Sequence, residues 1–176
     1  MASQIPHPHY YPAEPGPIGV MRDGRTIALA AMTSQAAAIL GPAIAAIDPW
    51  ARVSYDPARL TGFFAALETG APRYQIRVGD DLAGAMVVRC PWLSGPYLNI
   101  LGLLPEFQGR GIGDTALGWF ETEARTAKFR NIWLCVSSYN TGAQRFYVAH
   151  GFSATATLDA LTLDAFDEIL MRKRLI

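Results

Sequence analysis

The sequence has no excess of charge of either sign. Fifteen Lys and Arg residues stand against 15 Asp and Glu residues, so the formal net charge is zero. Proteins that bind nucleic acid or an anionic membrane surface usually carry a basic excess. The composition therefore predicts neither kind of partner, and any anion-binding site has to be local.

Cysteine is also scarce, with only Cys90 and Cys135. Each lies in or beside an apolar run, and neither belongs to a CxxC pair. This pattern favours buried, reduced thiols over a disulfide or a metal site. His7 and His9 flank a proline but have no third ligand nearby. We therefore expect a cytoplasmic protein without a metal.

No apolar run is long enough to be read as a membrane span. The stretch 27–47 is rich in Ala and Ile, but it begins about 20 residues into the chain and polar residues, Gly41 and Pro42 interrupt it. The proline-rich segment 1–19 predicts an extended arm without a helix or strand. Without internal repeats or a second composition regime, residues 20–176 are expected to form a single domain.

Hydrophobic periodicity predicts an α/β fold. A helix is expected to start at Thr33 or Ser34 and to be broken into two pieces by Gly41-Pro42. Two of the strands are joined through a helix and should therefore be parallel neighbours, whereas hairpins should make the rest of the sheet mostly antiparallel. We expect about seven strands, with helices on both faces. The expected strands are 25–31, 73–78, 82–89, 97–104, 132–136, 152–158 and 168–175, and the other expected helices are 57–67, 111–127 and 140–150.

A glycine-rich loop, Gln108–Gly113, follows an apolar strand and leads directly into a helix. Glycines allow consecutive backbone N–H groups to converge, and a helix N-terminus adds free donors with a partial positive charge. Arg110 can add a charge-assisted hydrogen bond. The segment therefore predicts a site for a phosphate or pyrophosphate group.

Two common phosphate-binding loops fit less well. A P-loop would need Gly-Lys-Ser or Gly-Lys-Thr, which is missing. Residues 111–116 match the dinucleotide fingerprint GxGxxA, but Ser137 and Ser138 stand where the next strand should end in an acid. The rest of the chain is also too short to supply the further βαβ units of a dinucleotide domain.

Two motifs together resemble the GNAT superfamily of acyl-CoA-dependent N-acyltransferases. Gln108, Gly111 and Gly113 match the pattern Gln/Arg-x-x-Gly-x-Gly/Ala, and residues 140–152 match Asn-x-x-Ala-x-x-Phe-Tyr-x-x-x-Gly-Phe. The resemblance covers about 73–175. It implies a splayed pair of central parallel strands, acetyl-CoA as cosubstrate and an amine on a small molecule or peptide as acceptor. Dimers are frequent among similar proteins, so a homodimer is among the expected partners.

The resemblance also assigns roles to individual residues. Tyr147 would protonate the departing CoA thiolate, although it could also serve only for packing. Asn140 could cap the last helix, bind the pantetheine arm or do both. The backbone amides of Leu101 and Leu103 would bind the thioester carbonyl and pantetheine, those of Gln108, Gly109, Arg110, Gly111, Ile112 and Gly113 would bind the pyrophosphate, and Ala143 and Phe146 would line the CoA groove.

One catalytic element of many similar proteins is missing, because the strand segment 97–100 carries no Glu to act as a base. Deprotonation of the amine could use ordered water or an acid on another element, and Asp114 is expected to cap its own helix. The acceptor pocket should lie between the loops 48–56 and 159–167. The candidate bases are Asp48, Asp56, Glu68 and Asp159, and the candidate wall residues are Trp50, Tyr55, Trp92 and Tyr97.

The sequence thus predicts an N-acetyltransferase that transfers acetyl from acetyl-CoA to a primary amine. A second hypothesis remains open, in which the chain is a non-catalytic module that binds acyl-CoA or a partner through the same fold.

Overall fold

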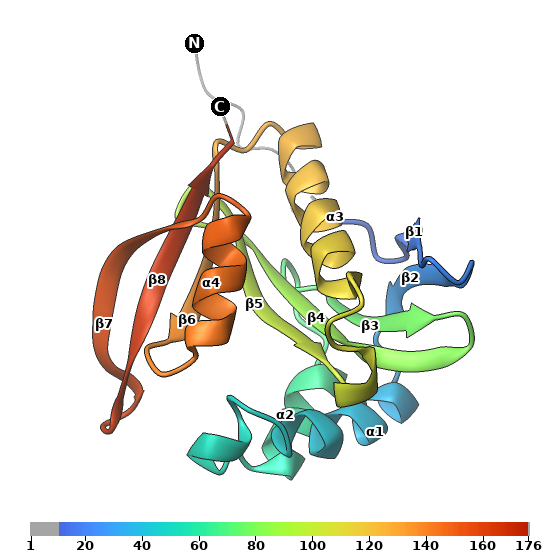
Figure 1. The fold of residues 1–176 in the computed structure, drawn as a ribbon, viewed down its shortest axis with the longest axis horizontal. Coiled ribbons are helices and arrows are strands. Elements are labelled where there is room, and N and C mark those ends of the chain that lie inside the picture. The colour runs from blue at the N-terminus through green and yellow to red at the C-terminus, as the bar shows by residue number, and fades with distance from the viewer. Residues whose placement is uncertain (1–10, 176) are drawn as a thin grey trace.

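The computed structural model describes residues 11–175, which form one sheet covered by helices (Figure 1). His7 and His9 lie outside the described residues. The strands are β1 Gly16–Val20, β2 Thr26–Ala31, β3 Arg73–Val78, β4 Asp81–Trp92, β5 Gly95–Leu103, β6 Asn131–Ser137, β7 Ser153–Leu163 and β8 Phe166–Arg174. The helices are α1 Ser34–Ala45, α2 Pro57–Ala65, α3 Ile112–Thr126 and α4 Thr141–Ala149, with short 3₁₀ turns at Ala51–Val53 and Pro105–Phe107.

The sheet has eight strands in the order β1-β2-β3-β4-β5-β6-β8-β7. Every neighbouring pair is antiparallel except β5 and β6, which are joined through α3 and run parallel. The predicted α/β architecture, with its mixed and mostly antiparallel sheet, is therefore confirmed. No helix within residues 11–175 is long and apolar enough to cross a membrane.

Alternation along β4 divides the interior into two cores, because successive strand residues point to opposite faces of the sheet. Met86 and Val88 belong to the core that includes α3 and Tyr147 of α4. Ala85 and Val87 belong to the core beneath α1 and α2. The helices thus cover both faces, as predicted, with α3 and α4 together on one of them (Figure 1).

The prediction that segment 1–19 lacks regular structure is wrong where β1 forms. This strand pairs only with β2, so Pro17 occupies an edge, where its missing N–H costs no ladder bond on the open side. A register shift lies between Pro17 and Gly19. Tyr11 is also part of the interior: its hydroxyl donates to the Phe120 carbonyl over 2.8 Å.

The predicted break at Gly41-Pro42 is wrong as well, because α1 continues to Ala45 with Pro42 inside it. The Ala38 carbonyl that loses its partner to the proline belongs to an exposed residue, where water can bind it. A Cβ at Gly41 would lie 2.0 Å from Thr61 Oγ1. Gly41 therefore permits the close packing of α1 on α2 and is not a stop signal.

The last two strands are longer than predicted. β7 extends to Leu163 and β8 begins at Phe166, so most of the expected loop 159–167 belongs to a hairpin with its turn at 164–165. The segment 159–167, predicted to border the acceptor pocket, therefore consists mainly of strand residues. The pairing of β7 with β8 sets their positions.

Candidate active site

The parallel strands β5 and β6 separate soon after they meet. They pair only at Tyr97 with Trp133 and at Leu98 with Leu134, although β5 continues to Leu103. The ladder between β4 and β5 skips Asn99, just beyond the last pair. Such a bulge bends a strand and increases its local twist. The sheet is therefore split between β5 and β6 over several residues.

The open edge of β5 presents the backbone groups to which the family resemblance assigned the acyl donor. The Leu104 amide donates to the Ala83 carbonyl on the β4 side over 2.9 Å. Because amide directions alternate along an antiparallel ladder, the amides of Leu103 and Leu101 point the other way, toward β6. They lie where β6 no longer supplies acceptors.

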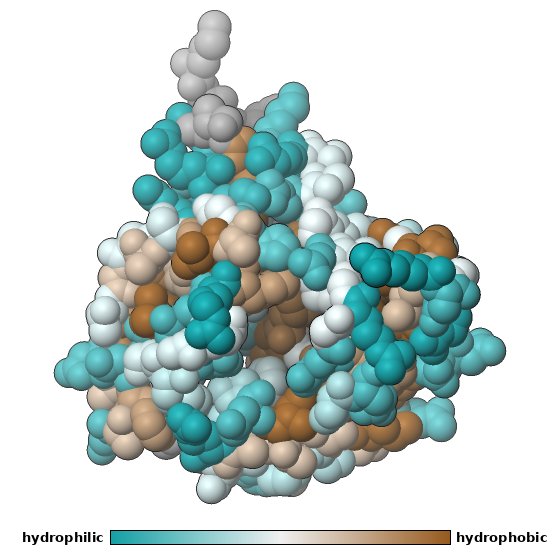
Figure 2. Space-filling model, in the orientation of Figure 1, coloured by the Kyte–Doolittle hydropathy of each residue, from teal (hydrophilic) through white to brown (hydrophobic). Residues whose placement is uncertain are grey.

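A cavity of about 820 Å³ occupies this split. Figure 2 shows a hollow on this face of the molecule with hydrophobic residues at its floor. Arg110 is exposed and Ile112 is buried in the core, and neither side chain lines the cavity. The other predicted site residues all do: Leu101, Leu103, Gln108, Gly109, Gly111, Gly113, Asn140, Ala143, Phe146 and Tyr147.

The glycine-rich loop depends on glycine for its backbone conformation. Gly109 has φ +68° and Gly111 has φ +79°, values that L side chains rarely adopt. The Gln108 side chain donates to the Leu103 carbonyl over 2.8 Å and so ties the loop to the end of β5. Helix α3 then starts at Ile112, so its first amides open onto the loop.

The groove between α3 and α4 is narrow at Gly113. A Cβ at this residue would lie 3.6 Å from Phe146 Cζ, so a larger side chain would fill the groove. Asn140 caps α4, with its Oδ1 accepting from the Ala143 amide over 3.1 Å, which confirms the capping interpretation of this residue. This cap fixes the residue at which α4 begins, directly after the loop that follows β6.

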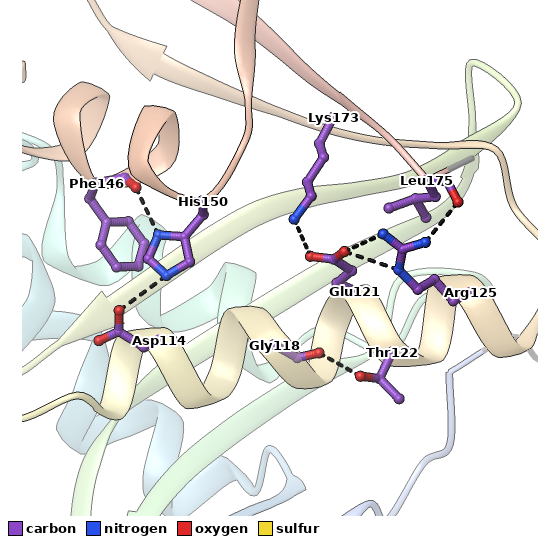
Figure 3. Close-up of polar contacts among 9 residues, drawn as sticks. All are labelled: Asp114, Gly118, Glu121, Thr122, Arg125, Phe146, His150, Lys173 and Leu175. Atoms are coloured by element: carbon purple, nitrogen blue, oxygen red, sulfur yellow. Dashed lines mark hydrogen bonds and ion pairs between the residues drawn. The ribbon is translucent and has the colours of Figure 1, made fainter.

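Asp114 does not act as a cap of α3, in contrast to the prediction. The N-cap position is Gly111, which provides no side-chain hydrogen bond. Asp114 Oδ1 instead lies 3.1 Å from His150 Nε2, and His150 Nδ1 is 2.8 Å from the Phe146 carbonyl (Figure 3). The side chain is drawn away because α4 ends beside the first turn of α3, so Asp114 links the two helices.

A second set of polar contacts ties α3 to the end of β8 (Figure 3). Glu121 pairs with Lys173 over 2.5 Å and with Arg125 over 2.7 Å. Arg125 also donates to the Leu175 carbonyl over 2.7 Å. Helix α3 is thereby anchored to the sheet, and α4 is joined to α3 through Asp114 and His150.

Tyr147 lies against the aromatic rings of Phe146 and Phe152 at centroid distances of 5.2 and 5.7 Å. The residue is 9% exposed, and burial raises the pKa of its phenol to about 12. Within residues 11–175 its hydroxyl has no hydrogen-bond partner, although no fully buried polar side-chain atom is left unpaired there. The hydroxyl therefore faces the cavity as a protonated donor.

Several aromatic residues outside the glycine-rich loop line the cavity. Trp50, Tyr55 and Tyr97 line the cavity, as the sequence predicted. Trp92 does not line it, because its ring packs between Tyr97 and Trp133 at centroid distances of 4.7 and 5.7 Å.

Of the four acids considered as bases, Asp48 alone lines the cavity. Asp56 caps α2 by accepting from the Ala58 amide, and Glu68 pairs with Arg73 and Arg89 at 3.1 and 2.6 Å. Asp159 does not line the cavity. Their positions in the sequence could not show which of these acids lines the cavity, because each lies near a loop.

One carboxylate of the cavity, Glu168, was not among the residues predicted from the sequence. This residue of β8 lines the cavity, and its Oε1 accepts from the Ser137 hydroxyl over 2.7 Å. Burial raises the pKa of the carboxyl, whereas the hydrogen bond from Ser137 lowers it. The only signal in the sequence was a carboxylate at the start of an apolar strand. The pairing of β6 with β8, which sets Ser137 opposite Glu168, was needed to recognise it as a site residue.

The chain has the fold of several solved acetyltransferases, at low sequence identity. No curated protein sequence matches the chain significantly. Among solved structures, it resembles the ribosomal-protein-S18-alanine N-acetyltransferase from Escherichia coli, at 18% identity and a TM-score of 0.66, over 85% of this chain and 94% of that one. A spermidine N-acetyltransferase chimera from Vibrio cholerae gives 16% identity and a TM-score of 0.69, over 84% and 95%. A GNAT family acetyltransferase from Elizabethkingia anophelis, solved with acetyl-CoA bound, gives 19% identity and a TM-score of 0.52, over 60% and 77%.

These solved structures show the fold of the chain, and a sequence match to a family shows the family. The profile of the acetyltransferase (GNAT) family matches residues 42–152, which is more than half of the chain. That range contains the split strands, the glycine-rich loop and the motif of α4. The chain therefore belongs to the acetyltransferase (GNAT) family.

Proposed function

We propose that this protein transfers an acetyl group from acetyl-CoA to a primary amine by direct attack within a ternary complex. The observation that carries the proposal is the continuous backbone surface along the split, from the free amides of β5 to the glycine-rich loop at the start of α3. Such a surface can bind pantetheine as an added strand and a pyrophosphate at the helix N-terminus.

The residues of the loop fit acetyl-CoA. The positive φ of Gly109 and Gly111 turns the backbone toward the cavity, and the small size of Gly113 keeps the groove to Phe146 open. The exposed Arg110 can add its charge to the phosphates. Acetyl-CoA bound to the Elizabethkingia anophelis structure supports the same choice of donor.

The Leu101 amide and the Tyr147 hydroxyl act on the thioester of acetyl-CoA. The Leu101 amide holds the carbonyl oxygen of the thioester as it gains negative charge. Tyr147, with a pKa of about 12, stays protonated at neutral pH and donates its proton to the sulfur as the C–S bond breaks. Asn140 keeps α4, and hence Tyr147, in position beside the split.

A panel of amines with detection of free CoA thiol tests the proposal. Release of CoA that depends on one amine, with formation of its acetamide, is the expected result. The alternative is a non-catalytic module that keeps the groove, and the missing carboxylate on β5 favours it. Micromolar binding of acetyl-CoA, about −7 to −8 kcal/mol, without turnover for any amine would establish the module instead.

A further inference from the structure

The charged side chains that line the cavity carry negative charge. Among the described residues that line it, the charged ones are Asp48, Asp114 and Glu168, and all three are acidic. Asp114 is paired with His150 at the loop end, and Asp48 is exposed. Among these three described lining residues, Glu168 is therefore the one carboxylate that is both partly buried and without a basic partner.

Glu168 approaches the split from the side opposite to Tyr147. Ile132, Leu134 and Val136 of β6 face the core that includes α3 and Tyr147. Because strand residues alternate, Ser137 and its ladder partner Glu168 lie on the other face of the sheet. The Tyr147 hydroxyl and the Glu168 carboxyl thus reach the same gap from opposite faces of the sheet.

The groups around Glu168 leave its carboxylate available. Ser137 of β6 donates to Oε1, and Tyr97 of β5 and Cys135 of β6 are close enough to interact with it electrostatically. Tyr97 and Cys135 are neutral at physiological pH because burial raises the pKa of each. The second carboxylate oxygen, Oε2, has no partner within the described residues, and it can accept a proton.

Aromatic side chains surround the remaining acceptor space. Trp50 and Tyr55 come from the segment between α1 and α2, Phe166 comes from β8, and Tyr139 joins the two by donating to the Pro49 carbonyl over 3.1 Å while packing on Phe166 at 4.6 Å. Aromatic faces stabilise both apolar groups and cations, and the Tyr139 and Tyr55 rings already carry Arg52 at 4.9 Å and Arg59 at 5.9 Å. Neither arginine lines the cavity, so a carboxylate on the acceptor would meet no basic side chain among the described residues of the lining.

We propose that Glu168 binds the ammonium group of the acceptor and removes one of its protons, and that the acceptor is a small cationic primary amine on an apolar, aromatic arm. This inference rests on the proposed acetyl transfer and adds its base and its substrate class.

Each proton that moves in the acetyl transfer has a donor and an acceptor. Glu168 takes one proton from the ammonium and passes it to solvent, and the neutral nitrogen attacks the thioester carbon. As the C–N bond forms and the C–S bond breaks, Tyr147 gives a proton to the sulfur. The nitrogen then loses a second proton, which restores the phenol, so one proton is released for each amide made.

The pKa of Glu168 gives the proposal a pH signature. Burial raises it toward the range in which a general base works well, and the carboxylate must be ionised to act. We expect kcat/KM for the amine to fall on the acid side as Glu168 becomes protonated. In Ser137→Ala the stabilising hydrogen bond to the carboxylate is lost, so this acid limb should move to higher pH.

The test uses three amines that separate the recognition elements. 2-Phenylethylamine carries the ammonium and the aromatic arm, L-phenylalanine adds only a carboxylate to it, and spermidine is a polycation without an aromatic group. We expect 2-phenylethylamine to be acetylated with a kcat/KM at least tenfold above that of the other two. Preference for phenylalanine or spermidine would overturn the substrate class.

Glu168→Gln tests the base. It should lower kcat/KM for 2-phenylethylamine about 10²-fold or more and remove the acid limb, while acetyl-CoA affinity stays within twofold. Asp159→Asn, an acid on the neighbouring strand outside the cavity lining, is the matched control and should change neither. A thermal unfolding midpoint for Glu168→Gln no lower than that of the parent excludes misfolding as the cause.

Two further outcomes separate this inference from the proposed function. If Glu168→Gln stays within threefold of the parent and keeps the acid limb while Tyr147→Phe is impaired, acetyl transfer stands and the role of Glu168 is wrong. If no amine of the panel releases CoA from a protein that binds acetyl-CoA, the proposed function fails, and the inference fails with it.

Discussion

Removal of the Tyr147 hydroxyl separates catalysis from packing. In Tyr147→Phe the ring keeps its contacts with Phe146 and Phe152, and no hydrogen bond within residues 11–175 is lost. The free energy of unfolding should therefore change by less than about 1 kcal/mol. A positioned general acid contributes about 10²- to 10⁴-fold to a rate, which corresponds to about 3–5 kcal/mol of transition-state stabilisation.

The expected result is thus a large fall in kcat with an unchanged acetyl-CoA affinity. Burial raises the pKa of Tyr147 to about 12, so the phenol stays protonated through pH 10 and its loss should lower kcat equally across that range. CoA release under saturating substrates and calorimetric titration measure the two quantities. Tyr74→Phe, a buried tyrosine outside the cavity, is the control that should keep kcat. A Tyr147→Phe rate within threefold of the parent would refute the role as acid.

Three other substitutions probe the loop, the helix contact and the buried carboxyl. Gly111→Val should abolish acetyl-CoA binding in calorimetry because a side chain at φ +79° distorts the loop, whereas Gly118→Ala, with open space around its Cβ, should keep binding and raise the free energy of unfolding by about 1 kcal/mol. Gly41→Ala should lower that free energy by about 1–3 kcal/mol in urea titrations, since its Cβ would meet Thr61 at 2.0 Å; an unchanged midpoint would contradict the packing. Because the folded-state pKa of Glu168 is raised, the folded protein binds its proton more tightly than the unfolded chain, so stability should fall as pH rises between the two pKa values. Glu168→Gln should lack this fall.

Local chemistry explains what the sequence could predict. The glycine-rich loop needs glycines at 109 and 111 and a helix that starts directly after them, and Asn140 needs only the helix that it caps. These requirements involve neighbours along the chain, so the residues could be recognised before the fold was known. The same holds for the turn and apolar runs of β3 and β4.

Nonlocal packing explains what the sequence could not predict. Gly41-Pro42 has the composition of a helix end, and only the contact with Thr61 makes it an interior position of α1. Pro17 is compatible with a strand because β1 is at the sheet edge. Glu168 becomes a site residue only through its register with Ser137 and the split beside β6.

A crystal structure of the protein with acetyl-CoA would show whether the cosubstrate binds in the split between β5 and β6. We expect pantetheine along β5, with the amides of Leu101 and Leu103 within hydrogen-bonding distance of it, and the pyrophosphate on the loop 108–113. The Tyr147 hydroxyl should lie near the sulfur. A ligand bound outside the split, or a split closed by further pairing of β5 with β6, would show that this is not the acetyl-CoA site.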